Sequence, residues 1–249
     1  MAGYHDFARF YDGFNVEADY EALHSFILSM FQSHGLIGGI IADLGCGTGE
    51  LTLRLASDGY DMIAVDGSAD MLAVLNDKRY KKEQQGILLL QQDLTKLDLY
   101  GTIQGAVSTF DTFNHIGPFA KVDEAIRRVG LFMEKGGLFL FDVNTPYKHT
   151  EILCNNTFTL EDEDAQCVWK NTLEDGGART KIELEITDDT ETFFECFYEY
   201  SYALDELKAS CERHGFQILD ILDGETFHAL SATSQRALLI GEKIVQCQS

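Results

Sequence analysis

The stretch that most constrains this chain is an apolar run that leads directly into three alternating glycines. Residues 40–44 read Ile-Ile-Ala-Asp-Leu, glycines follow at positions 45, 47 and 49, and a helix-like run covers residues 51–57. This order predicts a buried strand, a glycine turn and the start of a helix. Glycine lacks a Cβ and lets the backbone approach a ligand closely, and a helix start offers free N–H groups.

The spacing and charge of this turn favour a cationic ligand. Dinucleotide enzymes use Gly-x-Gly-x-x-Gly, with a diphosphate resting on the helix start. Here the glycines alternate, and the acid Asp43 precedes the first of them by two residues. A carboxylate at that place matches a positive charge better than a diphosphate.

Asp66 provides a second signal that is independent of the glycines. It ends a predicted strand over residues 61–65 and lies 17 residues beyond Gly49. An acid at the end of the second strand can accept hydrogen bonds from both hydroxyls of a ribose. Ser68 follows as a predicted helix N-cap, with Met71 on the buried side of that helix.

The rest of the chain alternates strand and helix patterns, with one interruption. Further strands are predicted over residues 86–91, 104–109, 137–143, 216–222 and 235–241, with helices from Asp19, over 121–133 and over 204–214. This alternation is typical of an α/β fold with a doubly wound, mostly parallel sheet. Residues 181–187 instead alternate strictly between apolar and polar, which is typical of an antiparallel strand with one wet face. We therefore expect one domain from residues 1–147 and 201–249, with residues 148–200 as an inserted antiparallel β lid.

These features together resemble the class I S-adenosylmethionine-dependent methyltransferases, of the small-molecule branch. The resemblance rests on Asp43-x-Gly-x-Gly-x-Gly, Asp66, Asp93 and the segment that ends in Asn114-His115. It implies a Rossmann-like methyltransferase fold of seven strands, the seventh lying antiparallel between the fifth and sixth. It also implies S-adenosylmethionine as the cofactor, bound by Tyr11, Tyr20, Asp43, Gly45, Cys46, Gly47, Asp66, Gly67, Met71, Asp93, Leu94 and Phe110.

The resemblance suggests a role for several of these residues. Asp43 and the first glycines would hold the amino-acid end of the cofactor, Tyr11 and Tyr20 would enclose its methionine part, and the remaining residues would contact ribose and adenine. Core packing would explain Met71 equally well, and packing on the core would also explain the aromatic N-terminus.

The acceptor side is less clearly marked. His115 is the candidate general base, because an unperturbed imidazole pKa of about 6.5 suits proton transfer near neutrality. A lone histidine is more often a structural hydrogen-bonding group. Tyr200, in an alternating aromatic row with Phe194, Cys196 and Tyr198, and Trp169 are further candidates on this side. The predicted activity is methyl transfer to a nitrogen or oxygen of a small molecule. A nicotinamide-dependent oxidoreductase and a non-catalytic cofactor-binding protein are the alternatives.

Composition narrows the class of partner. The formal charge is −22, and residues 151–200 hold 14 acidic and three basic residues. Such a charge repels nucleic acid, and the acidic segment mildly favours an amine as acceptor. Six cysteines without a Cys-x-x-Cys pair suggest neither a disulfide framework nor a metal site. The longest apolar runs are far shorter than the ~20 residues of a membrane span, so we expect no membrane partner and a cytoplasmic location.

Overall fold

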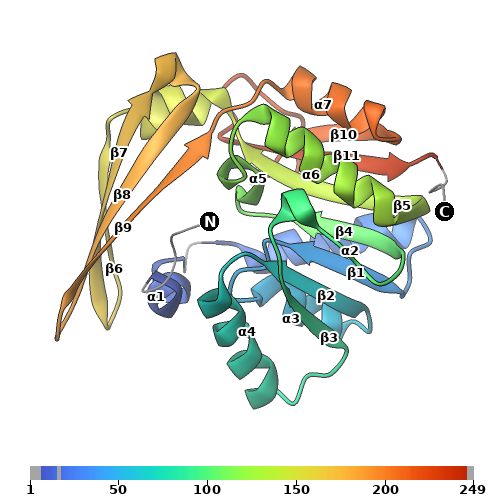
Figure 1. Cartoon of the computed structure of the whole chain (residues 1–249), viewed down its shortest axis with the longest axis horizontal. Coiled ribbons are helices and arrows are strands. Elements are labelled where there is room, and N and C mark those ends of the chain that lie inside the picture. Colours follow the sequence, from blue (N-terminus) through green and yellow to red (C-terminus); the bar gives the residue numbers. More distant parts are fainter. Residues whose placement is uncertain (1–6, 16–17, 246–249) are drawn as a thin grey trace.

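The computed structural model describes residues 7–15 and 18–245, which form two β-sheets with helices around the larger one (Figure 1). The larger sheet has the strand order β10-β11-β5-β4-β1-β2-β3. Its strands are β1 (Ile40–Leu44), β2 (Asp61–Asp66), β3 (Ile87–Gln91), β4 (Ile103–Ser108), β5 (Met133–Asn144), β10 (Phe216–Asp223) and β11 (Arg236–Lys243). β11 is antiparallel to both of its neighbours, β5 and β10, as the resemblance implies for the seventh strand.

Helices cover both faces of this sheet. One hydrophobic cluster joins the sheet to α6 (Phe119–Phe132), α7 (Leu204–Arg213) and the short helix α5 (Thr112–His115). A second cluster on the other face joins it to α2 (Tyr20–Ser33), α3 (Glu50–Ser57) and α4 (Ala69–Lys81). The predicted caps are present: Asp19 accepts from the Ala22 amide and Ser68 from the Met71 amide. Both faces being covered explains why the central strands are almost uniformly apolar.

The smaller sheet is antiparallel and lies between β5 and α7 in the chain. It consists of β6 (Thr157–Glu161), β7 (Ala165–Glu174), β8 (Arg179–Asp188) and β9 (Thr192–Tyr200), in that order. The predicted alternation is confirmed, since Ile182, Leu184 and Ile186 are all buried. A short helical segment, η2 (Lys148–Leu153), precedes the sheet, and η3 (Asp175–Gly177) turns β7 into β8. The division at residues 148 and 200 remains a prediction, and this separate sheet supports it.

Helix α1 (Phe7–Phe14) joins the two sheets. It contacts both α4 and β6, and in Figure 1 it lies between the lower part of the small sheet and α4. Phe7 and Phe10 belong to the small sheet's own hydrophobic core. The aromatic N-terminus therefore packs on the antiparallel sheet, and this pairing explains its unusual aromatic content.

The structure places the start of β5 earlier than the sequence indicated. The strand begins at Met133, the last residue of the helix predicted over residues 121–133, whereas the pattern placed the strand over residues 137–143. Met133 pairs with Ile103 of β4, and the register then shifts before Gly105 pairs with Leu138. Gly136 and Gly137 sit in this irregularity, where a Cβ on Gly137 would lie 2.7 Å from the Gln104 carbonyl oxygen. The glycines thus permit a bulge within the strand and do not end a helix.

No helix among residues 7–15 and 18–245 combines the length and apolar character that crossing a bilayer requires.

Candidate functional site

A cavity of about 570 Å³ lies at the carboxyl ends of the parallel strands, between the large sheet, α1 and the small sheet. This size suits a small organic ligand. The structure brings most of the predicted site residues to its wall: Tyr11, Gly45, Gly47, Asp66, Gly67, Met71, Leu94, Phe110 and His115. A much smaller hollow on the other side of the glycine turn is lined by Tyr20, Asp43 and Cys46, together with Tyr11, Gly45, Gly47 and Phe110.

Among the predicted cofactor-binding residues, Asp93 lines neither hollow. It is the N-cap of η1 (Leu94–Lys96), and one of its carboxylate oxygens accepts from both the amide and the hydroxyl of Thr95. Its neighbour Leu94 does line the cavity. A contact between Asp93 and an adenine ring therefore remains a prediction.

The three glycines of the turn serve different purposes. All have positive φ angles, of 75° at Gly45, 52° at Gly47 and 83° at Gly49, which favour glycine. A Cβ on Gly45 would lie 2.2 Å from Thr112, and a Cβ on Gly49 would lie 2.1 Å from Leu75, so these two glycines permit close packing. A Cβ on Gly47 would meet nothing within 4 Å. Gly47 therefore presents bare backbone to the cavity.

Asp66 organises the same turn. Its two carboxylate oxygens accept from the Gly47 amide at 2.9 Å and from the Ser68 amide at 2.7 Å. Burial raises the pKa of Asp66, although these amide hydrogen bonds partly offset the shift. The Gly47 amide is thus already bonded to a carboxylate and does not point at a free anion site.

The acidic side chains around the glycine turn indicate which cofactor the turn fits. Asp43, Asp66 and Glu50 surround it, and Glu50 occupies the first turn of α3, where a diphosphate would otherwise rest. Burial raises the pKa of Asp43 to about 7, with Thr52 donating to its carboxylate. Several carboxylates around a turn repel a diphosphate and attract a cation. These carboxylates therefore fit the positively charged sulfonium and ammonium groups of S-adenosylmethionine.

The segment after β4 is held in a strained backbone conformation. Phe110 and Asp111 have φ angles of 56° and 57°, which are uncommon for residues with a Cβ. The buried carboxylate of Asp142 accepts from both of their amides, at 2.9 and 2.7 Å. Arg236 lies over the Phe110 ring, 4.9 Å from its centroid, and its Nε is 3.8 Å from Asp142. Asp142 thereby fixes the backbone that carries Phe110 and Asp111 into the cavity.

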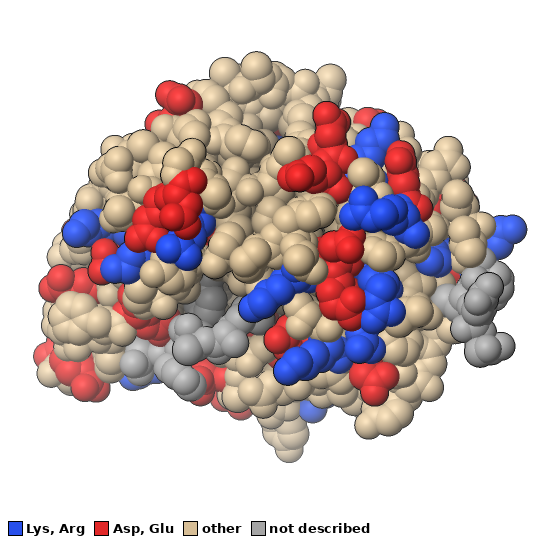
Figure 2. Space-filling view, turned by 45° about the horizontal axis from the view of Figure 1, so that its top comes forward, with Lys and Arg blue, Asp and Glu red and all other residues tan. Residues whose placement is uncertain are grey.

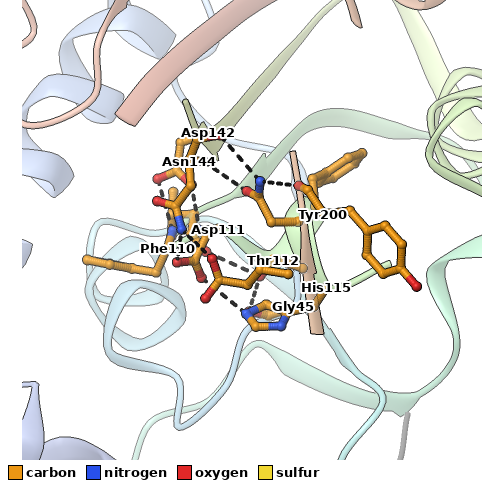
Figure 3. Close-up of polar contacts among 12 residues, drawn as sticks. Gly45, Phe110, Asp111, Thr112, His115, Asp142, Asn144 and Tyr200 are labelled. Carbon is orange, nitrogen blue, oxygen red and sulfur yellow. Dashed lines mark hydrogen bonds and ion pairs between the residues drawn. The ribbon is translucent and has the colours of Figure 1, made fainter. Parts of the chain in front are cut away.

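Three titratable groups that line the cavity meet in its wall, and Figure 3 labels two of them, Asp111 and His115. They are Asp111, His115 and Glu199, and each offers a ligating atom within 4.8 Å of the others. His115 Nε2 lies 3.4 Å from Asp111 Oδ1. The Asn144 amide nitrogen donates to Asp111 Oδ2 and to Glu199 Oε2, both at 2.8 Å. Lys148 in turn donates to the Asn144 amide oxygen at 2.9 Å.

The environment of His115 favours its protonated form. Burial alone would lower the pKa of His115, but the hydrogen bond and charge of Asp111 raise it overall, with further contributions from Glu199 and the Tyr198 carbonyl. Burial would likewise raise the pKa of Asp111, yet His115 holds it well below its usual range. The pair therefore favours an imidazolium beside a carboxylate.

Trp169 lines the cavity, whereas Tyr200 is not among the lining residues. Figure 3 shows the Tyr200 ring turned away from the Asp111 cluster, and only its carbonyl joins the network by accepting from Asn114 at 2.8 Å. The alternating row of Phe194, Cys196, Tyr198 and Tyr200 lies on the outer face of β9, where Phe194 is 74% exposed. The inner face carries Phe197 and Glu199. The sequence pattern identified the strand but selected the wrong face.

Sequence reasoning missed several polar residues of the cavity and its supports. Among them are Asp111, Asp142, Asn144, Lys148, Glu199 and Arg236. Their position in the sequence offered a usable signal for Asp142 and Asn144, which end the continuously buried part of β5, residues 137–144. A polar residue at the carboxyl end of such a strand faces the ligand side of the sheet.

Charged side chains of both signs are mixed on one face of the molecule. On the face in Figure 2, acidic and basic side chains of the described residues intermingle over the small sheet and the helices, without a continuous basic area. Ion pairs among the described residues include Arg127–Glu124 and Arg179–Glu174.

Comparison with known proteins agrees with this geometry. Residues 41–137 match the model of a methyltransferase domain family. A protein of Geobacillus sp. (strain WCH70) that is named as a methyltransferase is 32% identical over 248 residues, which covers 96% of this chain and 99% of the relative.

Two solved structures share the fold. The first is an S-adenosylmethionine-dependent methyltransferase from Clostridium acetobutylicum, with a TM-score of 0.86, 24% identity, and 95% of this chain and 97% of the other covered. The second is the sugar N-methyltransferase KedS8 from Streptoalloteichus sp., with a TM-score of 0.76, 17% identity, and 98% and 95% covered.

Proposed function

The chain belongs to the class I S-adenosylmethionine-dependent methyltransferases, and we propose that it methylates a nitrogen or oxygen of a small-molecule acceptor bound beside His115. The single observation that carries this proposal is the shape of the cavity. One continuous space connects the acidic glycine turn with the Asp111–His115–Glu199 cluster. A donor at one end and an acceptor at the other would meet inside it.

In the proposed assignment, Asp66 accepts hydrogen bonds from the ribose hydroxyls, and Gly67, Met71 and Leu94 line the adenine end. Asp43, Gly45, Cys46 and Gly47 hold the amino-acid end, with Tyr11, Tyr20 and the Phe110 backbone closing over it. S-adenosylmethionine supplies an activated methyl group on a sulfonium when bound. The protein's part is to orient the acceptor, exclude water and remove one proton.

The apolar side chains that line the cavity favour a small-molecule acceptor. Apolar side chains of the small sheet and α1 line the cavity, namely Trp169, Phe158, Leu160 and Phe7. A polymer would need an open groove, whereas a small molecule can be enclosed. That one structural neighbour is a sugar N-methyltransferase supports the same class of acceptor.

Turnover tests the proposal directly. The purified protein is incubated with S-adenosylmethionine and a panel of small amines, alcohols, amino sugars and sugars, and release of S-adenosylhomocysteine is followed. We expect acceptor-dependent release together with a mass increase of one methyl group on the acceptor. Methylation of RNA or a protein in place of every small molecule would overturn the proposal.

A further inference from the structure

The two carboxylates of the acceptor cluster are oriented by a shared support. One Asn144 amide nitrogen donates to Asp111 and to Glu199, and Lys148 fixes that amide from behind. In each carboxylate, therefore, one oxygen accepts a hydrogen bond from Asn144 and the other does not. For Asp111 the second oxygen, Oδ1, faces the His115 ring.

The second oxygen of Glu199 has no such partner. Glu199 is 2% exposed and lines the cavity, and its Oε1 accepts no hydrogen bond from the described residues. This oxygen is not among the fully buried polar atoms that lack a partner in the described residues, so it is open to the cavity that Glu199 lines. The cavity is the direction from which a donor can arrive.

His115 is less suited to accept a proton than Glu199. Its ring lies between a carboxylate and the Tyr198 carbonyl, which both stabilise the imidazolium. Burial and the charge of Asp111 raise the pKa of Glu199, while His115, Lys148 and the Asn144 amide lower it in part. A carboxylate with a raised pKa is better suited to take up a proton than an imidazole whose surroundings favour its charged form.

We propose that the acceptor is an amine, and that Glu199 Oε1 binds its ammonium group and takes one proton from it. This inference rests on the proposed function. The N–H bond breaks with its electron pair left on nitrogen as the lone pair, and an O–H bond forms on Glu199. Asp111 and His115 are positioning residues, which act on the amine through the geometry and charge of Glu199.

The surrounding wall suits an organic ammonium. Trp169 and Phe7 line the cavity, with ring centroids 6.4 Å apart in an edge-to-face arrangement. Aromatic faces attract organic cations, most strongly where water is excluded. Burying the ammonium beside a carboxylate also favours transfer of the proton, because the neutral pair is cheaper to desolvate than the ion pair.

The experiment compares matched acceptors and matched variants. Benzylamine and benzyl alcohol, cyclohexylamine and cyclohexanol, and an aminodeoxy sugar and its parent sugar are assayed with the wild-type protein. The best acceptor is then assayed with Glu199→Gln, Glu199→Asp and His115→Gln over a range of pH. Gln at position 199 can still accept from Asn144, and Gln at position 115 can still donate to Asp111, so both variants preserve the hydrogen bonds around the cluster.

We expect methylation of amines but not of the matched alcohols. Glu199→Gln should lower kcat about 100-fold or more, which is the usual contribution of a general base, and Glu199→Asp should restore part of it. The rise of kcat with pH should disappear in Glu199→Gln and persist in His115→Gln. Binding of S-adenosylhomocysteine should be unchanged in all three variants.

Three results would overturn the inference. They are methylation of the alcohols alone, a kcat for Glu199→Gln within threefold of the wild type, and loss of the pH-dependent rise in His115→Gln alone. If no nitrogen or oxygen acceptor is methylated while S-adenosylhomocysteine still binds, the proposed function fails and the inference falls with it.

Discussion

At the scale of single residues, the carboxylates around the glycine turn decide what the cavity binds. Asp66 has both oxygens fixed by backbone amides and still lines the cavity, so its remaining lone pairs are oriented toward a ligand. We predict that Asp66→Ala weakens binding of S-adenosylhomocysteine by about 10- to 100-fold, because hydrogen bonds to a charged acceptor contribute about 1.5–3 kcal/mol.

Isothermal titration measures this change. Asp61→Ala is the matched control, since Asp61 begins the same strand at its exposed amino end. We expect the control to bind like the wild type. Undiminished binding in Asp66→Ala would remove Asp66 from the site.

We predict that Asp43 makes cofactor binding depend on pH. Its pKa is raised to about 7 by burial, above its ordinary value of about 3.9, so below pH 7 the free protein carries a proton there. The ammonium group of the ligand favours the ionised carboxylate, and binding must then release that proton. We predict that affinity for S-adenosylhomocysteine falls as pH drops below 7, by up to about tenfold per pH unit.

Titration at pH 6 in two buffers with different ionisation enthalpies checks this prediction. The apparent binding enthalpy should differ between the buffers for the wild type and should not differ for Asp43→Asn. Equal enthalpies for the wild type would show that Asp43 does not change its charge on binding.

At the scale of secondary-structure elements, the Asp12 side chain links α1 to the glycine turn and to α4. Asp12 accepts from the Thr48 hydroxyl at 2.6 Å, next to the glycine turn, and pairs with Lys78 of α4 at 2.6 Å. Tyr11, its neighbour on α1, lines the cavity. The two contacts thus hold α1 closed against the cofactor side.

We predict that Lys78→Met speeds dissociation of S-adenosylhomocysteine by about two- to fivefold, since partly exposed ion pairs contribute up to about 1 kcal/mol. Stopped-flow measurement of ligand release checks it. Lys81→Met, on the same helix, serves as the control and should not change the rate. An unchanged rate in both variants would mean that α1 does not limit release.

Elements with a local signal were predictable from the sequence, and the acceptor cluster was not. The glycine turn, Asp66 and the Ser68 cap depend on neighbouring residues, so the pattern located them. Glu199 and Asp111 approach each other only after β9 folds back over α5, which no local pattern records. Glu199 was also one of 14 acids in an acidic segment, and the aromatic row beside it drew attention to the opposite face of the strand.

At the scale of the whole molecule, the small sheet and α1 share one hydrophobic core that is separate from the two cores of the large sheet. Leu184, at 1% exposure, lies at its centre. We predict that Leu184→Ala destabilises this unit by about 2–5 kcal/mol. The large sheet should remain folded, because its cores do not include Leu184.

Hydrogen exchange resolves this difference. Amides of α1 and β6–β9 should exchange faster in Leu184→Ala, while those of β1, β4 and β5 keep their protection. Leu140→Ala, in β5 of the large sheet, is the comparison and should accelerate exchange throughout the large sheet. Uniform loss of protection in Leu184→Ala would show that the two sheets unfold as one unit.

The most direct test of the central claim is a crystal structure of the protein with S-adenosylhomocysteine. We predict that the ribose hydroxyls lie against Asp66 and the amino-acid end beside the glycine turn. The sulfur should face the Asp111–His115–Glu199 cluster across the 570 Å³ cavity. Density for the ligand outside this cavity, or a ribose far from Asp66, would contradict the account.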